Sequence, residues 1–342
     1  MDFLPEEIYY LILLLLDTPT LISVSMIDWH HQNIIKKIPT KKSPKRMLVD
    51  LAAENGYLEI VKWAAVGSVL SIDACSLAAL NGHLDVLKWL VENHYDWDSR
   101  TCSNAAKGGH LEVLKWARPH GCEWDSDTCS YAAFRGHLEI LKWARENGCV
   151  WNTNTCSSAA LRGHFEVLKW AKENGCECNH YACSHAAFGG HLKILKWLRK
   201  NGCQWYSDIC SNAAKKGHFE VLKWAKENGC SWDHNVCHHI AFWGNLEVLK
   251  WARALGCEWD GRTCSNAASE GHLEVLKWAR ENNCSWDSDT CYRAACGGHL
   301  EVLKWARAHG CPWNGLTYGR AAEGGRHVEV LKWARENECP EH

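Results

Sequence analysis

The chain has 342 residues, with 46% apolar and 23% charged side chains, and its net charge is −2. A chain so close to neutral has no general attraction to nucleic acid or to an anionic membrane, so both are disfavoured as partners. The apolar run from Ile8 to Leu16 is too short to span a bilayer, and acidic residues precede it, unlike in a secretory leader. We therefore expect an intracellular, cytoplasmic protein whose 20 cysteines are reduced.

Residues 1–35 do not share the periodicity of the rest of the chain. Their sequence from Phe3, FLPEEIYYLILLLLDTPTLISVSMIDWHHQNII, resembles an F-box, the motif that docks on the Skp1 adaptor of cullin ubiquitin ligases. The later Trp of that motif is displaced by two positions, to Trp29. The alternative is a hydrophobic cap that covers the first repeat of an array. The resemblance implies docking of a Skp1-type adaptor through Leu4, Pro5, Ile8, Ile12, Leu16 and Leu21.

A basic stretch, residues 36–46, follows as KKIPTKKSPKR. Pro39 and Pro44 oppose helix formation, so we expect an exposed linker here. The basic side chains would also suit a nuclear-import signal, which leaves a nuclear location open beside the cytoplasmic one. Residues 47–342 form the third predicted region, an array of repeats.

A Lys-Trp dipeptide after an aliphatic residue recurs through this third region at steps of 26 to 28 residues. A strict period of this length is typical of solenoids, propellers and other arrays. The period predicts about eleven repeats. The recurring tryptophans are Trp63, Trp89, Trp116, Trp143, Trp170, Trp197, Trp224, Trp251, Trp278, Trp305 and Trp333.

One unit, residues 125–151, reads DSDTCSYAAFRGHLEILKWARENGCVW. Asp125 suits a helix N-cap and Gly136 a C-terminal stop, so a short first helix is predicted between them. A second helix follows, with an apolar face that runs from Leu138 to Ala144. Neither helix is long enough to be stable alone, so each must pack on its neighbours. The unit shows no alternation of apolar and polar residues, so no strand is predicted.

The unit resembles an ankyrin repeat. GHLEILKWARENGCVWN is similar to the second ankyrin helix and its exit, and DTCSYAA is similar to the start of the first helix. The unit is about six residues shorter than ankyrin's 33, and the missing part forms projecting β-hairpin fingers in that family. The resemblance implies an all-α solenoid of about eleven stacked two-helix repeats, without substantial fingers, that binds other proteins as a monomer. F-box and ankyrin arrays occur together in large DNA viruses, which suggests a viral protein that redirects a host ligase.

Cysteines and histidines recur at fixed places in the unit, which raises the alternative of zinc binding. The two cysteines of a unit, such as Cys122 and Cys129, are seven residues apart in sequence. Equivalent cysteines are separated by one repeat, about 10 Å, which is too far for a shared ion or a disulfide. We therefore interpret the cysteines as small buried hydrophobic residues and expect no metal and no other cofactor. We interpret the histidines at the turn between the helices as turn and capping residues.

Two series of tryptophans are predicted to pack in the core. Those on the second helix would face the Ala-Ala pair of the first helix, large side chains against small ones. The other series stands two residues after the loop cysteine, where it would anchor the loop, and Cys178 replaces it once.

Three first-helix positions vary from repeat to repeat while the rest of the unit is nearly constant. They flank the Ala-Ala pair, and in an ankyrin-like solenoid they would line the concave face. Variable residues on a constant scaffold are typical of a recognition surface, and aromatic residues with Arg are common at binding hot spots. The alternative is free variation at solvated positions. The candidate partner-binding residues are Tyr131, Phe134, Arg135, Leu161, Arg162, Phe188, Phe242 and Trp243.

These features favour a protein–protein interaction module, and specifically a substrate receptor that links a target protein to a Skp1–cullin ubiquitin ligase. The alternative is a plain ankyrin-type scaffold in which the N-terminal segment serves only as a cap. The sequence holds no phosphate loop, G-x-S-x-G or H-E-x-x-H motif, so we expect no enzyme activity.

Overall fold

The computed structural model describes residues 44–65, 72–322 and 327–340. Across these ranges all regular structure is helical, in 22 helices and without a strand, so the predicted all-α class is confirmed. No helix within them is long and apolar enough to cross a membrane. The F-box-like segment, with its six predicted docking residues, lies outside the described residues. Residues 36–43 of the predicted linker also lie outside them.

The helices form eleven pairs along the described chain, in agreement with the predicted number of repeats. α4 begins at Pro44, before the predicted start of the array at residue 47, because proline is tolerated in the first turn of a helix. The first helices of the pairs are α4 (Pro44–Glu54), α6 (Ile72–Asn81), α8 (Ser99–Gly108), α10 (Ser126–Arg135), α12 (Thr153–Arg162), α14 (His180–Phe188), α16 (Asp208–Lys215), α18 (Val236–Phe242), α20 (Gly261–Ser269), α22 (Ser288–Cys296) and α24 (Gly315–Ala322). The second helices are α5 (Leu58–Ala65), α7 (Leu84–Glu92), α9 (Leu111–Ala117), α11 (Leu138–Glu146), α13 (Phe165–Glu173), α15 (Leu192–Lys200), α17 (Phe219–Glu227), α19 (Leu246–Ala254), α21 (Leu273–Glu281), α23 (Leu300–Ala308) and α25 (Val328–Glu336).

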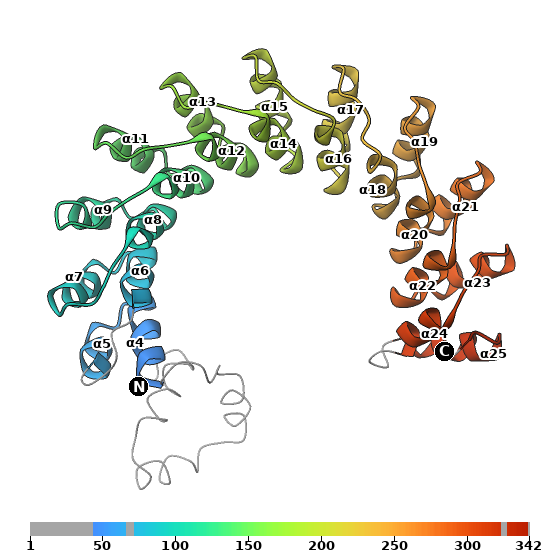
Figure 1. Ribbon diagram of the computed structural model, residues 1–342, viewed down its shortest axis with the longest axis horizontal. Coiled ribbons are helices and arrows are strands. Elements are labelled where there is room, and N and C mark those ends of the chain that lie inside the picture. Colours follow the sequence, from blue (N-terminus) through green and yellow to red (C-terminus); the bar gives the residue numbers. More distant parts are fainter. Residues whose placement is uncertain (1–43, 66–71, 323–326, 341–342) are drawn as a thin grey trace, which may run out of the picture. The chain divides into compact units, whose positions relative to one another are not determined.

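The chain divides into two compact units, Met1–Cys178 and Asn179–His342. Within each unit, the first helices of successive repeats pack directly on one another (Figure 1). Each second helix packs mainly on the first helix of its own pair, so the second helices form a more widely spaced row. This is the predicted solenoid of two-helix repeats. The described residues contain no strand, and therefore no β-hairpin finger.

Local sequence signals set the ends of the helices as predicted. The Asp125 side chain accepts a hydrogen bond from the backbone N–H of Asp127 at the start of α10. Gly136 ends that helix with a φ of +82°, a conformation that strongly favours glycine. α11 ends where the Asn147 side-chain amide donates to the carbonyl of Trp143 at 2.8 Å.

The core combines small residues from the first helices with aliphatic residues from the second helices. Ala132 and Ala133 of α10 are fully buried, and their size allows neighbouring first helices to lie close together. Ile140 and Leu141 of α11 are also buried, whereas Leu138, at the start of the predicted apolar face, is only half-buried. The buried face of the second helix is therefore narrower than the sequence predicts.

The prediction that the tryptophans pack in the core is wrong. Trp143 of α11 is half-buried, and its ring packs edge-on against Trp124 of the preceding loop, with centroids 5.7 Å apart. The Arg118 guanidinium lies over the Trp124 ring at 4.7 Å. An indole suits this outer position because its apolar surface packs while its N–H stays near water. The same arrangement recurs in other repeats, for example as Arg145, Trp151 and Trp170.

Candidate functional site

The α10 helix of the first unit carries two aromatic side chains, Tyr131 and Phe134, that are not fully buried. Tyr131 is 37% exposed, and Phe134, three residues later, is half-buried. Lys107 of α8 places its ammonium 5.6 Å from the Tyr131 ring, and Arg162 of α12 places its guanidinium 4.9 Å from the Phe134 ring. Each ring is thus contacted by a cation from a neighbouring first helix, an attractive arrangement.

Helices α10 and α12 supply the other first-unit candidates. Arg135 and Arg162 are exposed, and Leu161 is half-buried. None of the variable positions on α8, α10 and α12 is acidic, so this surface carries only neutral and basic side chains. We call it the α10–α12 surface and define it as Lys107, Tyr131, Phe134, Arg135, Leu161 and Arg162.

The remaining candidates belong to the second unit. Phe188 is half-buried, with the Lys216 ammonium 4.8 Å from its ring. Phe242 and Trp243 are 37% and 46% exposed, and their rings meet edge to face with centroids 5.7 Å apart. Phe188 therefore shows a cation–aromatic pairing like that of the α10–α12 surface, whereas Phe242 and Trp243 contact each other.

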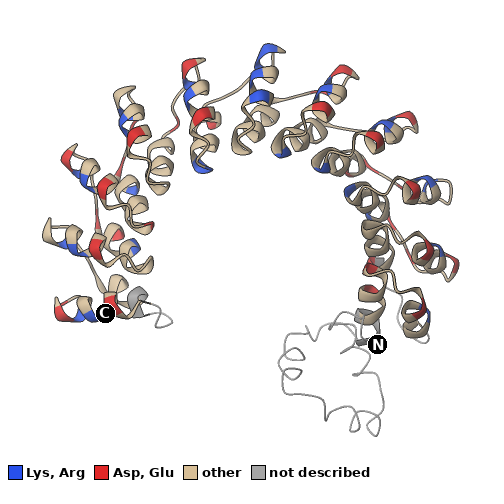
Figure 2. Ribbon diagram, turned by 180° about the vertical axis from the view of Figure 1, so that it is seen from behind, with Lys and Arg blue, Asp and Glu red and all other residues tan. Residues whose placement is uncertain are grey.

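Charged residues are concentrated on the second helices, as the blue and red segments of the ribbon in Figure 2 show. A typical pair is Glu139 and Lys142 of α11, whose charged atoms are 2.9 Å apart on the outer side of the repeat. Exposed pairs of this kind contribute little to stability. The second helices thus present a mixed-charge, solvated face, whereas Tyr131, Tyr181 and Phe242 are exposed aromatic side chains on first helices.

The turn histidines do not cap the second helices as predicted. His164 precedes α13, but its side chain makes no capping hydrogen bond. Its Nε2 instead donates to the carbonyl of Phe134, in the preceding repeat, at 3.1 Å. The histidines therefore link consecutive repeats. Equivalent bonds join His83 to Glu54, His272 to Phe242 and His299 to Ser269.

In the repeat formed by α18 and α19, which lacks the turn histidine, Trp243 makes the equivalent bond to the preceding repeat. Asn245 stands at the histidine position, and its side chain caps α19 by accepting a bond from the Val248 N–H at 3.0 Å. The indole N–H of Trp243 donates to the carbonyl of Lys215 at 3.2 Å, the place where the histidine bond would be expected. Trp243 therefore has a structural role that its variation between repeats did not reveal.

Replacing Trp243 with Phe should lower the free energy of unfolding by at least about 1 kcal/mol, because the hydrogen-bond donor is lost and the indole is replaced by a smaller phenyl ring. Adding Asn245→His to this variant should restore only part of the loss, because it supplies the usual imidazole donor but removes the Asn245 cap of α19. Denaturant unfolding of the wild type, the single variant and the double variant measures this. Equal stability of all three proteins would contradict the assigned link.

The cysteines that contact each other are not the pairs that lie seven residues apart in the sequence. The Sγ atoms of Cys102 on α8 and Cys122 in the loop after α9 lie 3.1 Å apart, although 20 residues separate them. The interpretation of the cysteines as buried holds for all except Cys178 and Cys296, but it missed this contact. In three other repeats the first-helix thiol donates to the backbone carbonyl of the loop cysteine 20 residues later, with Sγ and oxygen 3.7–3.9 Å apart: Cys156 to Cys176, Cys237 to Cys257 and Cys291 to Cys311.

Two exposed tyrosines in the second unit were missed because they lie outside the three variable positions. Tyr181 and Tyr206 are 54% and 56% exposed, and the His180 ring meets the Tyr206 ring edge-on at 5.0 Å. The sequence did mark Tyr206 as unusual, because it stands where other repeats have the Asp or Asn that caps the first helix. Ser207, at the N-cap of α16, makes no side-chain capping bond.

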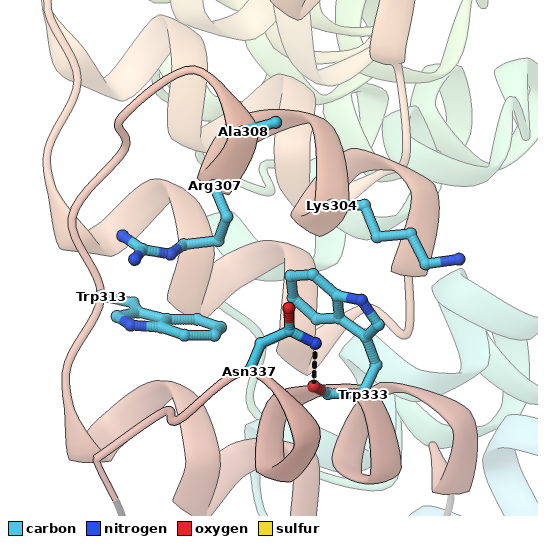
Figure 3. Close-up of a pocket in the computed structure, with 6 residues that line it drawn as sticks. All are labelled: Lys304, Arg307, Ala308, Trp313, Trp333 and Asn337. Carbon is cyan, nitrogen blue, oxygen red and sulfur yellow. Dashed lines mark hydrogen bonds between the residues drawn. The ribbon is translucent and has the colours of Figure 1, made fainter.

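A shallow cavity of about 280 Å³ lies beside the last two second helices (Figure 3). Its walls include Arg307, Trp313 and Trp333, which form one of the recurring Arg-Trp-Trp sets. The Asn337 amide on its rim is bonded to the carbonyl of Trp333 at 2.8 Å. The cavity is therefore lined by residues of the repeat framework. Among the described residues, no group of three or more His, Cys, Asp or Glu side chains is arranged to hold a metal ion.

One stretch of the repeat array matches a known protein family. Residues 72–118 match the model of the family described as ankyrin repeats (many copies). The match spans α6 to α9, and the other described helix pairs have the same arrangement. No curated protein matches the chain. Ankyrin repeats indicate a protein–protein interaction module, and such all-helical arrays are typically binding scaffolds rather than enzymes.

Proposed function

We propose that this chain is a substrate receptor: the α10–α12 surface binds a segment of a target protein, and the N-terminal segment binds a Skp1-type adaptor of a ubiquitin ligase. The observation that carries the first half is the pairing of two aromatic rings, the exposed Tyr131 and the half-buried Phe134, with cations from neighbouring first helices. The second half rests on the F-box resemblance of residues 1–35. In this proposal the chain is a monomer that acts in the cytoplasm, or in the nucleus through the basic stretch, and a viral origin fits the same scheme.

The chemistry of the α10–α12 surface favours an acidic target segment with apolar side chains. Lys107, Arg135 and Arg162 supply positive charge, and no acidic residue stands at the variable positions between them. Tyr131 and Phe134 supply aromatic area of the kind that dominates binding energy at protein interfaces. Because the charges are exposed, raised salt should weaken such binding.

Skp1 capture tests the receptor role. Tagged full-length protein should bring down a Skp1-type adaptor, and the double variant Leu4→Ala, Pro5→Ala should lose this capture while remaining folded by circular dichroism. A matched control carries Glu139→Ala on α11, far along the sequence from the F-box-like segment, and should capture the adaptor like the wild type. If the wild type brings down no adaptor, the receptor proposal fails.

The alternative function is a plain scaffold in which residues 1–35 only cover the first repeat. The many apolar side chains of this segment favour burial against some surface, which a cap would also provide. Deleting the segment should then lower the melting temperature of the repeats. A receptor segment that binds only the adaptor predicts an unchanged melting temperature, so one thermal melt separates the two functions.

A further inference from the structure

Two buried thiols face each other in the repeat formed by α8 and α9. The thiol of Cys102, on α8, donates a hydrogen bond to the sulfur of Cys122, in the loop after α9, with the Sγ atoms 3.1 Å apart. The Cys122 carbonyl oxygen is 4.0 Å from the Cys102 sulfur, so the thiol is the nearer acceptor. Because disulfide sulfurs are about 2.05 Å apart, a movement of about 1 Å would bring these two to bonding distance.

The direction of this hydrogen bond gives the two thiols different roles. Because Cys102 donates its proton toward Cys122, it stabilises the thiolate form of Cys122. This bond lowers the pKa of the Cys122 thiol although burial opposes the shift, and the charge of Arg118 lowers it further. The same bond, together with burial, raises the pKa of the Cys102 thiol. Cys122 is thus the nucleophile of the pair, and Cys102 holds a proton beside it.

Access to the pair depends on the loop that carries Cys122. Cys102 and Cys122 are 0% and 1% exposed, but the loop residues on either side of Cys122, Gly121 and Glu123, are exposed. Cys122 is therefore a single inward-pointing side chain on a surface loop. A local opening of this loop, without unfolding of the repeat, would expose its sulfur to a small oxidant.

The sequence weakens the attachment of this loop to α9. Pro119 has no backbone N–H and cannot donate the hydrogen bond that would continue the helix. α9 accordingly has 7 residues, whereas α11 has 9 and continues to Glu146, at the position equivalent to Pro119. The N–H of Cys122 lies 3.2 Å from the carbonyl that accepts its bond at the end of α9, against 2.9 Å for Cys149 after α11. We therefore expect this loop to open more readily than the loop after α11.

We propose that Cys102 and Cys122 form an oxidisable pair that peroxide-class oxidants convert to a disulfide when the loop opens. The thiolate of Cys122 attacks hydrogen peroxide: an S–O bond forms, the O–O bond breaks, and the departing hydroxide takes up the proton that Cys122 released. The sulfur of Cys102 then attacks the Cys122 sulfur: the S–S bond forms, the S–O bond breaks, and the Cys102 proton leaves with the hydroxide as water. Two thiols and one peroxide thus give one disulfide and two waters, and the peroxide is the species reduced.

The pair lies within the first unit, and its oxidation does not depend on the proposed receptor function. A disulfide between Cys102 and Cys122 would join α8 covalently to the loop after α9, across 20 residues of chain. Loop closure of this kind restricts the unfolded chain, so the oxidised protein should unfold at a higher denaturant concentration than the reduced protein.

The test uses full-length protein with Cys178→Ser and Cys296→Ser, because these are the two cysteines that are not buried and would react on their own. Reduced protein is treated with hydrogen peroxide, remaining thiols are blocked with N-ethylmaleimide, and disulfide-linked peptides are identified by mass spectrometry without reduction. The expected first product links Cys102 to Cys122. It should form at least about tenfold faster than a disulfide in any other repeat.

Three further variants assign the roles. Cys102→Ala and Cys122→Ala should each slow the loss of thiols by at least about tenfold. Pro119→Glu keeps both thiols and restores the residue that α11 has at the equivalent, exposed position, so it should slow formation of the link by at least about threefold. The proposal is overturned if the main disulfide forms in another repeat, if Cys122 is oxidised without a link to Cys102, or if folded Pro119→Glu protein forms the link as fast as its parent.

Discussion

Replacing Gly136 with Ala should lower the free energy of unfolding by about 2–3 kcal/mol. The φ of +82° at Gly136 costs an alanine about 1–2 kcal/mol, since L-residues rarely adopt this conformation. In addition, a Cβ at this position would lie 2.6 Å from Nδ1 of His164. The imidazole would have to move, and its hydrogen bond to the carbonyl of Phe134 would be lost at a cost of about 1 kcal/mol.

Gly148 provides a matched control within the same repeat. It has the same φ of +82°, but a Cβ there would meet nothing within 4 Å. Gly148→Ala should therefore show only the conformational cost of about 1–2 kcal/mol. Denaturant unfolding of both variants, with and without His164→Ala, isolates the coupling between Gly136 and His164. Equal losses for the two glycine variants would show that the histidine contact contributes nothing.

Replacing His238 with Ser should make the protein more resistant to acid. His238 is 8% exposed on α18, at a position where most repeats have serine. Burial, and then the nearby charge of His239, lowers the pKa of His238 to about 4. Arg262 also lowers this pKa, while Asp260 and Asp233 oppose the shift.

The sign of the effect follows from this lowered pKa. The unfolded chain binds a proton near pH 6.5 but the folded chain does not, so stability falls as pH drops from about 6.5 to about 4. The loss from this one group is at most roughly 3 kcal/mol. Melting temperatures measured across that range should fall less steeply for His238→Ser than for the wild type. The pKa values of His110 and His218 are also lowered by burial, and both residues remain in the variant. Parallel pH profiles would contradict the assignment to His238.

Much of the fold follows from the period of the sequence. The Lys-Trp spacing predicts the number of repeats, and the Asp and Gly signals at Asp125 and Gly136 predict where the first helix begins and ends. The contacts between Cys102 and Cys122 were not predictable in this way. They depend on how the loop returns to the first helix, and sequence spacing alone does not determine that path.

The candidate surface was predictable only in part. Variation between repeats identified Tyr131, Phe134 and Arg162, and the structure places them on neighbouring first helices. Variation also selected Trp243, whose indole N–H replaces a missing histidine bond. A position can vary because a neighbouring position has changed, and only the three-dimensional contacts distinguish this compensation from recognition.

Quantitative affinity purification of full-length protein tests the central claim that the α10–α12 surface binds a partner protein. The wild type is compared with the double variant Phe134→Ala, Arg162→Ala and with the control Glu139→Ala, Lys142→Ala on α11 of the same repeat. We expect a defined set of proteins with acidic segments to be retained by the wild type and the control. The surface variant should lose them by on the order of tenfold or more, as expected for removal of a hot-spot aromatic and its arginine. Retention of the same proteins by all three would show that partner binding does not use this surface.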